Sequence, residues 1–77
     1  MSASAFPLAM AGEDDRVTVV ALHGGTALVR RLSEMGLNVG CELLVLQRQG
    51  GGLIVLRGGT RLALGGGMAQ KILVSKL

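Results

Sequence analysis

The sequence predicts a mainly β fold, a small and partly closed barrel of about five short strands with one short inserted helix. The chain has only 77 residues, which is enough for one hydrophobic core but not for several. Its thirteen glycines and single proline divide it into short segments, a pattern typical of short strands joined by tight turns. We expect the strands to close into a barrel, because closure removes exposed strand edges.

The N-terminal part predicts a short tail followed by a strand. Residues 1–5 are mostly small, so we expect a flexible N-terminus there and a single domain over 6–77. The arm 6–8 (Phe-Pro-Leu) supplies the first anchored residues and lies over the core. Residues 16–22 (RVTVVAL) are mostly β-branched or apolar, which predicts a strand that ends before a glycine pair.

The apolar period then changes, and one short helix is expected over about 26–35. Three apolar residues recur at helical spacing and share one face: Leu28, Leu32 and Met35. This face is expected to be buried. Thr26 is the expected N-cap, and Gly36 stands where a C′ glycine belongs.

Four further strands are expected after the helix, separated by three glycine clusters: Cys41–Gln49, Leu53–Arg57, Thr60–Leu64 and Lys71–Ser75. A two-residue loop at 58–59 would place Val55 opposite Leu62. A three-residue loop at 50–52 would place Gln47 opposite Val55. The third cluster, 65–69, is too short for a helix and is expected to form a single 3₁₀ turn.

Counting back from these two loops assigns the strand residues to two faces of the sheet. The inner face holds Leu43, Val45, Leu53, Val55, Leu62 and Leu64. The outer face holds Glu42, Leu44, Leu46, Arg48, Ile54, Leu56, Arg61 and Ala63. The outer face carries the charges and therefore points to solvent.

Four large aliphatic residues on this outer face form what we call the apolar stripe: Leu44, Leu46, Ile54 and Leu56. A water-facing sheet normally alternates to polar residues at such positions. We therefore predict that the stripe binds a partner protein or a second copy of the chain, with Arg30 or Arg31 at its rim. The alternative is that the apolar helix face or the arm 6–8 covers the stripe internally.

The sequence predicts no catalytic residue, no metal ligand and no cofactor. The one histidine and the one cysteine, His23 and Cys41, fall in different elements. Glu13, Asp14 and Asp15 are consecutive, which is typical of a solvated turn and lacks the ligand spacing of a Ca²⁺ site. None of the glycine clusters has the Lys-Ser/Thr or G-x-G-x-x-G pattern of a phosphate-binding loop. We therefore expect a protein that is not an enzyme.

Charge and composition argue against a dedicated nucleic-acid-binding protein, which stays open as an alternative. The net charge is only +3, and basic residues are scattered over several elements: Arg16, Arg30, Arg48, Arg57 and Lys76. Phe6 is the only aromatic residue, so stacking platforms for bases are missing. The lone cysteine needs no oxidising compartment, and no apolar stretch approaches the roughly 18 residues of a membrane span. We expect a cytoplasmic protein that is not embedded in a membrane.

The segment 30–40, RRLSEMGLNVG, resembles the R-R-L-x-E-L/M-G-L/I-x-x-G signature of the FeoA family, the small cytosolic components of bacterial ferrous iron uptake. The glycine pair 24–25, the segment G-x-x-L-A-L at 59–64 and A-x-x-I-x-V at 69–74 also follow the family pattern. The resemblance thus covers about residues 6–75. One stretch departs from it: where the family often has an arginine and an acidic residue, residues 65–68 read GGGM.

The resemblance implies an SH3-like β-barrel with a helical insertion that acts as a non-enzymatic binding module. FeoA-type proteins associate with the cytoplasmic part of FeoB, a membrane Fe²⁺ transporter with a G-domain. The implied role is therefore that of an accessory protein that binds or regulates such a transporter. A similar domain ends some metal-dependent repressors, so a transition-metal-binding regulatory domain is an alternative.

Overall fold

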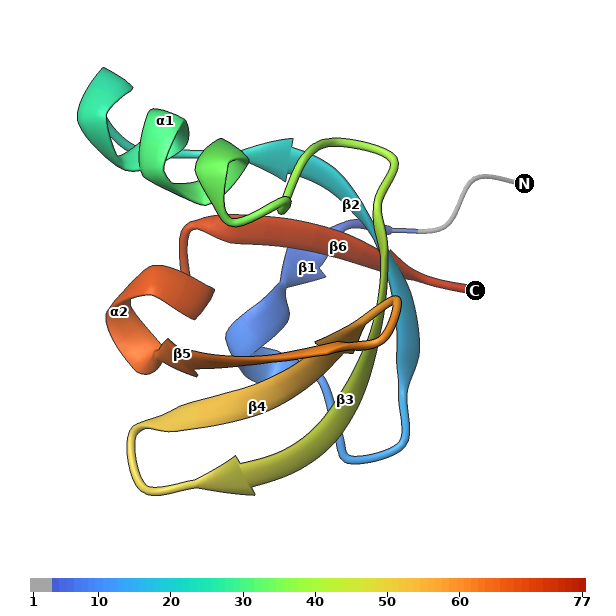
Figure 1. The fold of residues 1–77 in the computed structure, drawn as a ribbon. Helices are drawn as coiled ribbons and strands as arrows, with labels where there is room; N and C mark the ends of the chain where they lie inside the picture. The colour runs from blue at the N-terminus through green and yellow to red at the C-terminus, as the bar shows by residue number, and fades with distance from the viewer. Residues whose placement is uncertain (1–3) are drawn as a thin grey trace.

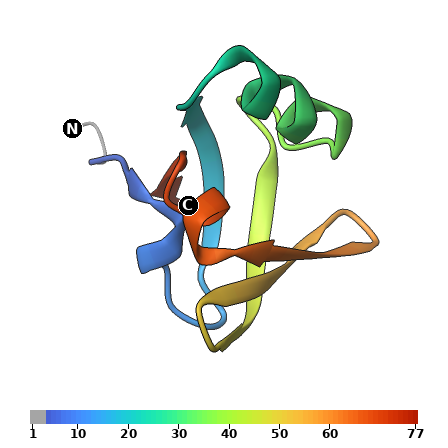
Figure 2. The same ribbon diagram turned by 90° about the vertical axis from the view of Figure 1, so that its left-hand side faces the viewer.

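The computed structural model describes residues 4–77 and shows a six-stranded antiparallel sheet that curls around one core (Figures 1 and 2). The strand order is β1-β6-β2-β3-β4-β5. The strands are β1 (Phe6–Pro7), β2 (Arg16–Leu22), β3 (Glu42–Gln49), β4 (Gly52–Arg57), β5 (Thr60–Gly65) and β6 (Ile72–Lys76). The expected mainly β fold with one inserted helix is confirmed, with one strand more than expected.

The additional strand is β1, formed by the expected N-terminal arm. Phe6 lies opposite Val74 of β6, and Leu8, which begins the 3₁₀ helix η1 (Leu8–Met10), is fully buried. Two residues, one of them proline, carry too little pattern to predict a strand. Of the expected flexible segment 1–5, residues 1–3 lie outside the described residues, while Ser4 and Ala5 are exposed and precede β1.

Helix α1 (Thr26–Glu34) ends in a Schellman motif. The N–H of Leu37 donates to the carbonyl of Leu32 at 2.9 Å, and the N–H of Gly36 donates to the carbonyl of Ser33 at 2.9 Å. Gly36 has φ +84°, as its predicted C′ position requires. Since Leu32 and Leu37 are both fully buried, the motif also fixes the helix to the core.

Two expectations about the helices were wrong. The N-cap of α1 is Gly25, not Thr26, because Gly25 is extended and its carbonyl accepts the first helical bond from Val29 at 3.0 Å. The segment before β6 is a four-residue α-helix, α2 (Gly66–Ala69), and not a 3₁₀ turn. The N–H of Gln70 donates to the carbonyl of Gly66 at 3.0 Å, which is the i−4 spacing of an α-helix.

The two hairpins differ in how well the sequence predicts them. The β4–β5 hairpin has the expected register, with Val55 opposite Leu62. In the β3–β4 hairpin, Gln49 already pairs with Gly52, so its loop has two residues and not the expected three. Gln47 consequently lies opposite Ile54, not opposite Val55.

A β-bulge in β3 shifts this register a second time. Val45 lies opposite Val55, so Leu46 is the extra residue. The two shifts add up to two residues, and because side chains alternate with period two, the part of β3 before the bulge keeps its expected faces. Between the bulge and the loop the faces are exchanged: Arg48 lies opposite the buried Leu53 and belongs to the inner side, not to the outer face.

The core is aliphatic, and no polar or charged side chain among the described residues is buried in it. Of the predicted inner face, all members are buried except Leu62, which is half-buried and packs against the core. The remaining core residues come from the arm, α1, α2 and the other strands: Leu8, Ala11, Val17, Val19, Leu32, Leu37, Ala69, Ile72 and Val74. Helix and arm thus share the core with the inner face of the sheet.

We predict that Gly36→Val strongly destabilises the protein. At φ +84° a β-branched side chain is strained, and a Cβ at this position would lie 2.6 Å from Cζ of Arg57. Gly40 is the matched control, because it has φ +94° but nothing within 4 Å of its Cβ position. In thermal melts, Gly36→Val should lower the melting temperature by at least about 5 °C more than Gly40→Val does, which corresponds to about 1 kcal/mol for a domain of this size. If Gly36→Val melts within about 2 °C of the wild type, this assignment of the helix end is wrong.

Candidate partner-binding face

The cysteine and the histidine show no sign of nucleophilic chemistry. Burial raises the pKa of the Cys41 thiol, and the positive charge of Arg57 only opposes this rise. A raised pKa keeps the thiol protonated at neutral pH, whereas a reactive cysteine needs a lowered one. His23 is exposed at the end of β2, and its backbone N–H donates to the carbonyl of Lys71 at 2.7 Å.

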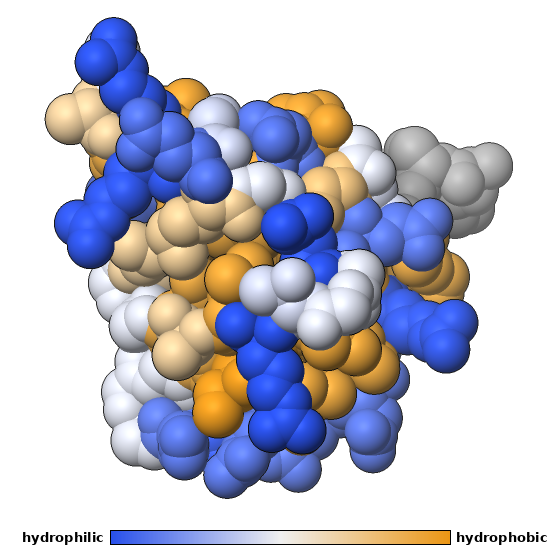
Figure 3. Space-filling view, in the orientation of Figure 1, coloured by the Kyte–Doolittle hydropathy of each residue, from blue (hydrophilic) through white to orange (hydrophobic). Residues whose placement is uncertain are grey.

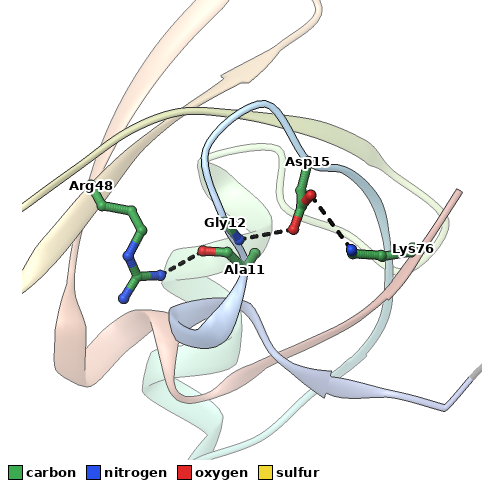
Figure 4. Close-up of polar contacts among 5 residues, drawn as sticks. All are labelled: Ala11, Gly12, Asp15, Arg48 and Lys76. Carbon is green, nitrogen blue, oxygen red and sulfur yellow. Dashed lines mark hydrogen bonds and ion pairs between the residues drawn. The ribbon is translucent and has the colours of Figure 1, made fainter.

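The acidic turn before β2 sends its carboxylates to different partners, of which Figure 4 shows those of Asp15. Asp15 accepts a hydrogen bond from the N–H of Gly12 at 2.8 Å and lies 3.6 Å from Nζ of Lys76. Glu13 accepts a hydrogen bond from the backbone N–H of Arg48 at 3.0 Å. Among residues 4–77 no group of three or more His, Cys, Asp and Glu side chains comes together. The turn therefore organises the backbone and offers no ligand set for a metal ion.

Several basic side chains are also used within the protein. Nη1 of Arg48 donates to the carbonyls of Ala9 at 2.7 Å and Ala11 at 2.5 Å, which ties β3 to η1 (Figure 4). The guanidinium of Arg57 packs against Gly36, and Lys76 pairs with Asp15. Basic residues that looked scattered in the sequence are thus largely structural, which weakens the case for a nucleic-acid-binding groove.

The apolar stripe lies on the outer face of β3 and β4, and all four of its residues are half-buried. None of them belongs to the core cluster. The side chains proposed to cover the stripe internally pack against that cluster instead: Phe6, Leu8, Leu28, Leu32 and Met35. The stripe is therefore a partly exposed apolar surface outside the core. In the view of Figure 3, hydrophobic residues reach the surface at several places beside hydrophilic ones.

The strand register places two arginines beside the stripe. Across four neighbouring strands, Arg16 lies opposite Leu44, Leu44 opposite Leu56, and Leu56 opposite Arg61. Both arginines are exposed. The sequence placed Arg61 on the outer face but did not place Arg16 there, because the pairing of β2 with β3 has no local signal. Arg30 and Arg31 are exposed on α1, and their place at the rim stays a prediction.

Two shallow hollows open along the outer face. One, of about 210 Å³, is lined by Arg16, Glu42, Leu43, Leu44, Leu56, Gly58 and Leu77. The other, of about 230 Å³, is lined by Gln49, Gly52, Leu53, Ile54, Ala63, Leu64 and Gly65. Leu44 and Leu56 of the stripe line the first hollow, and Ile54 of the stripe lines the second. No helix among the described residues is long and apolar enough to cross a membrane.

Comparison with known proteins gives a consistent result. Residues 6–76 match the model of the FeoA domain. The chain is 39% identical over 69 residues to a protein of Methanocaldococcus jannaschii named Fe(2+) transport protein A, covering 90% of this chain and 84% of that protein. It also superposes on the crystal structure of an iron uptake regulatory protein (FeoA), with a TM-score of 0.88, 36% identity, and coverage of 96% of this chain and 99% of that chain.

A larger regulator contains a similar domain. A manganese-dependent transcriptional repressor in complex with manganese superposes with a TM-score of 0.91 and 26% identity. The match covers 99% of this chain but only 38% of the repressor. The expected likeness to a domain of metal-dependent repressors is thereby confirmed.

We predict that the protein folds without a metal ion, because its core is aliphatic and complete. Thermal melts followed by circular dichroism should be the same with and without EDTA. As a second measurement, anaerobic Fe²⁺ should leave the melting temperature unchanged, since an ion that binds the folded state raises it. Unfolding in EDTA would contradict the prediction.

We also predict that Leu46→Lys and Leu56→Lys leave the fold intact, because both residues lie outside the core cluster and a lysine can extend its charge into water. Each should cost no more than about 1 kcal/mol. Val55→Lys is the matched control. Val55 is the neighbour of Leu56 on β4 and is fully buried, so an unpaired charge there should cost several kcal/mol. If both stripe variants unfold, the stripe belongs to the core and the partner binds elsewhere.

Proposed function

The chain belongs to the FeoA family, and from this premise we propose that it is a non-enzymatic, cytoplasmic accessory protein of ferrous iron uptake. We infer that residues 6–77 act as one binding domain whose partner is the cytosolic part of a FeoB-type membrane Fe²⁺ transporter. The match of the family model to residues 6–76 supports the role in iron transport. The partner and the mode of action are the part that needs testing.

The observation that carries the proposal is the apolar stripe, which lies outside the hydrophobic core. The stripe is half-exposed although the chain has a complete core elsewhere. Removing such a surface from water upon binding is favourable, and interface centres are enriched in apolar residues that are surrounded by polar ones. The acidic turn, Arg48 and Arg57, by contrast, are used in internal contacts. Binding, and not chemistry, is what this arrangement supports.

A transition-metal-binding regulatory domain is the second candidate, favoured by the likeness to the manganese-dependent repressor. The donor set of this chain does not fit a tight site, because residues 4–77 bring together no three His, Cys, Asp or Glu side chains. The chain also corresponds to only 38% of the repressor. We therefore treat Fe²⁺ as the cargo of the transport system and not as a resident ligand of this domain.

We expect calorimetry to detect binding between this protein and the purified cytosolic part of a FeoB-type transporter from the same cell. Leu56→Lys should abolish the binding while keeping the wild-type melting temperature. Val39→Lys is the matched control, because Val39 is an apolar residue that is 64% exposed in the loop before β3, away from the stripe. It should bind like the wild type.

The same variants should be tested in cells that lack this chain. Wild type and Val39→Lys should restore Fe²⁺ uptake, and Leu56→Lys should not. If the wild type does not bind the transporter, the proposed partner is wrong. If Leu56→Lys binds as well as the wild type, the partner is right but the stripe is not the contact.

A further inference from the structure

We propose that the outer face carries a docking hollow for an acidic polypeptide segment, with one aliphatic side chain of the segment seated against Leu44 and Leu56. Carboxylates on either side of that side chain would pair with Arg16 and Arg61. The inference deepens the proposed function, on which it rests in so far as the segment belongs to the transporter. It names the chemistry that the partner must present.

The strand register places four residues in one row across the sheet. Arg16, Leu44, Leu56 and Arg61 lie on four adjacent strands, β2, β3, β4 and β5, each opposite the next. Residues directly opposite each other in a sheet point to the same face. Three strand spacings of about 4.8 Å place the backbones of the two arginines about 14 Å apart. Two cations thus flank two aliphatic side chains in one line across the sheet.

The surface is hollowed at Leu44 and Leu56. The hollow of about 210 Å³ contains Leu44 and Leu56 together with Arg16 and Glu42. Gly58, in the loop between β4 and β5, also lines the hollow and contributes no side chain to fill it. An engineered apolar cavity of about 150 Å³ is large enough to take up benzene. The hollow therefore has room for one aliphatic side chain of a partner.

The charged side chains of the row and of the hollow favour one kind of partner. Arg16 and Arg61 are both exposed, and neither forms an ion pair with any residue in the part of the chain that the structure describes. Arg16 and Glu42 are the charged side chains that line the hollow, and Arg61, opposite Leu56, adds a second positive charge beside it. The row with its lining therefore has an excess positive charge, and complementary charge across an interface favours an acidic partner.

The same features argue against other occupants. Two copies that met through this face would bring excess positive charge together, and each copy carries +3 overall. A nucleic acid would meet no aromatic side chain in the hollow, whereas single-strand binders stack bases on such side chains. A lipid surface requires apolar side chains that project into it, but the four stripe residues are half-buried, and three of them, Leu44, Ile54 and Leu56, line hollows.

The test begins with peptides of defined chemistry. Blocked peptides Glu-Glu-Leu-Glu-Glu, Glu-Glu-Ser-Glu-Glu and Lys-Lys-Leu-Lys-Lys are titrated into the ¹⁵N-labelled protein. We expect the first to shift the amide signals of Leu44, Leu56 and Gly58, the second to do so at least about tenfold more weakly, and the third not to bind. Equal binding of all three peptides would overturn the inference. So would binding of anionic vesicles or single-stranded DNA at these amides without binding of the acidic peptide.

The second measurement uses the cytosolic part of the transporter and two double variants with the same change in net charge. Arg16→Glu/Arg61→Glu should weaken binding by about tenfold or more and remove most of its salt dependence. Arg30→Glu/Arg31→Glu, on α1, makes the same change in net charge at the rim predicted from the sequence, and it should have a much smaller effect if Arg16 and Arg61 pair with the partner. Melting temperatures verify that each variant folds, and Arg16→Gln/Arg61→Gln replaces the first pair if reversal of the charge unfolds it.

The outcomes separate this inference from the proposed function. If the transporter binds but the α1 pair has the larger effect, the docking hollow is wrong and the proposed function stands. If the acidic peptide binds at the hollow but the transporter does not, the hollow stands and the proposed partner is wrong. If neither binds, both are wrong.

Discussion

One extra residue in β3 determines which side chains of this strand face the core and which face outward. The β-bulge at Leu46 keeps Val45 opposite Val55 in the core and leaves Leu44 opposite Leu56 on the outer face. Beyond the bulge it turns Arg48 to the inner side, where the guanidinium reaches the carbonyls of η1. Without the bulge, a one-residue difference in register would exchange the faces along the strand. The core, the attachment of the N-terminal arm and the apolar stripe therefore all depend on it.

The polar groups of the domain follow from this arrangement. With an entirely aliphatic core, charged side chains are found at its margins, where they bond to exposed backbone or to each other. Arg48 satisfies two carbonyls at the end of η1, and hydrogen bonds from a charged group contribute roughly 1.5–3 kcal/mol each. Arg57 packs against the glycine that ends α1, where a cation also interacts favourably with the helix dipole. Arg16 and Arg61, beside the stripe, are exposed and have no such contact among the described residues.

Sequence reasoning located the faces of β4 and β5 because a short loop fixes short-range register, whereas the faces of Leu44 and Val45 on β3 are as expected because the wrong loop length and the bulge offset each other. The β4–β5 pairs follow directly from a two-residue glycine loop, and all of them are as expected. The bulge at Leu46 and the strand Phe6–Pro7 carry no local signal, so Arg48 was assigned to the wrong face and β1 was missed. Arg16 pairs with Leu44, 28 positions away in the sequence. A contact of this range depends on the whole fold, so the sequence could not place Arg16 beside the stripe, and the rim at Arg30 or Arg31 stays a prediction.

The stretch in which this chain departs from the family pattern has a physical role of its own. A Cβ on Gly66 would collide with the carbonyl oxygen of Gly51, so the start of α2 packs directly on the backbone of the β3–β4 loop. A charged side chain at this position would separate the two segments. Glycine at this position therefore permits close packing of α2 on the loop. The side chains that can recognise a partner lie further along the same sheet, where aliphatic residues and unpaired arginines share one row. We conclude that the departure from the family pattern leaves the outer face of β2–β5 as the surface on which specificity is most readily built.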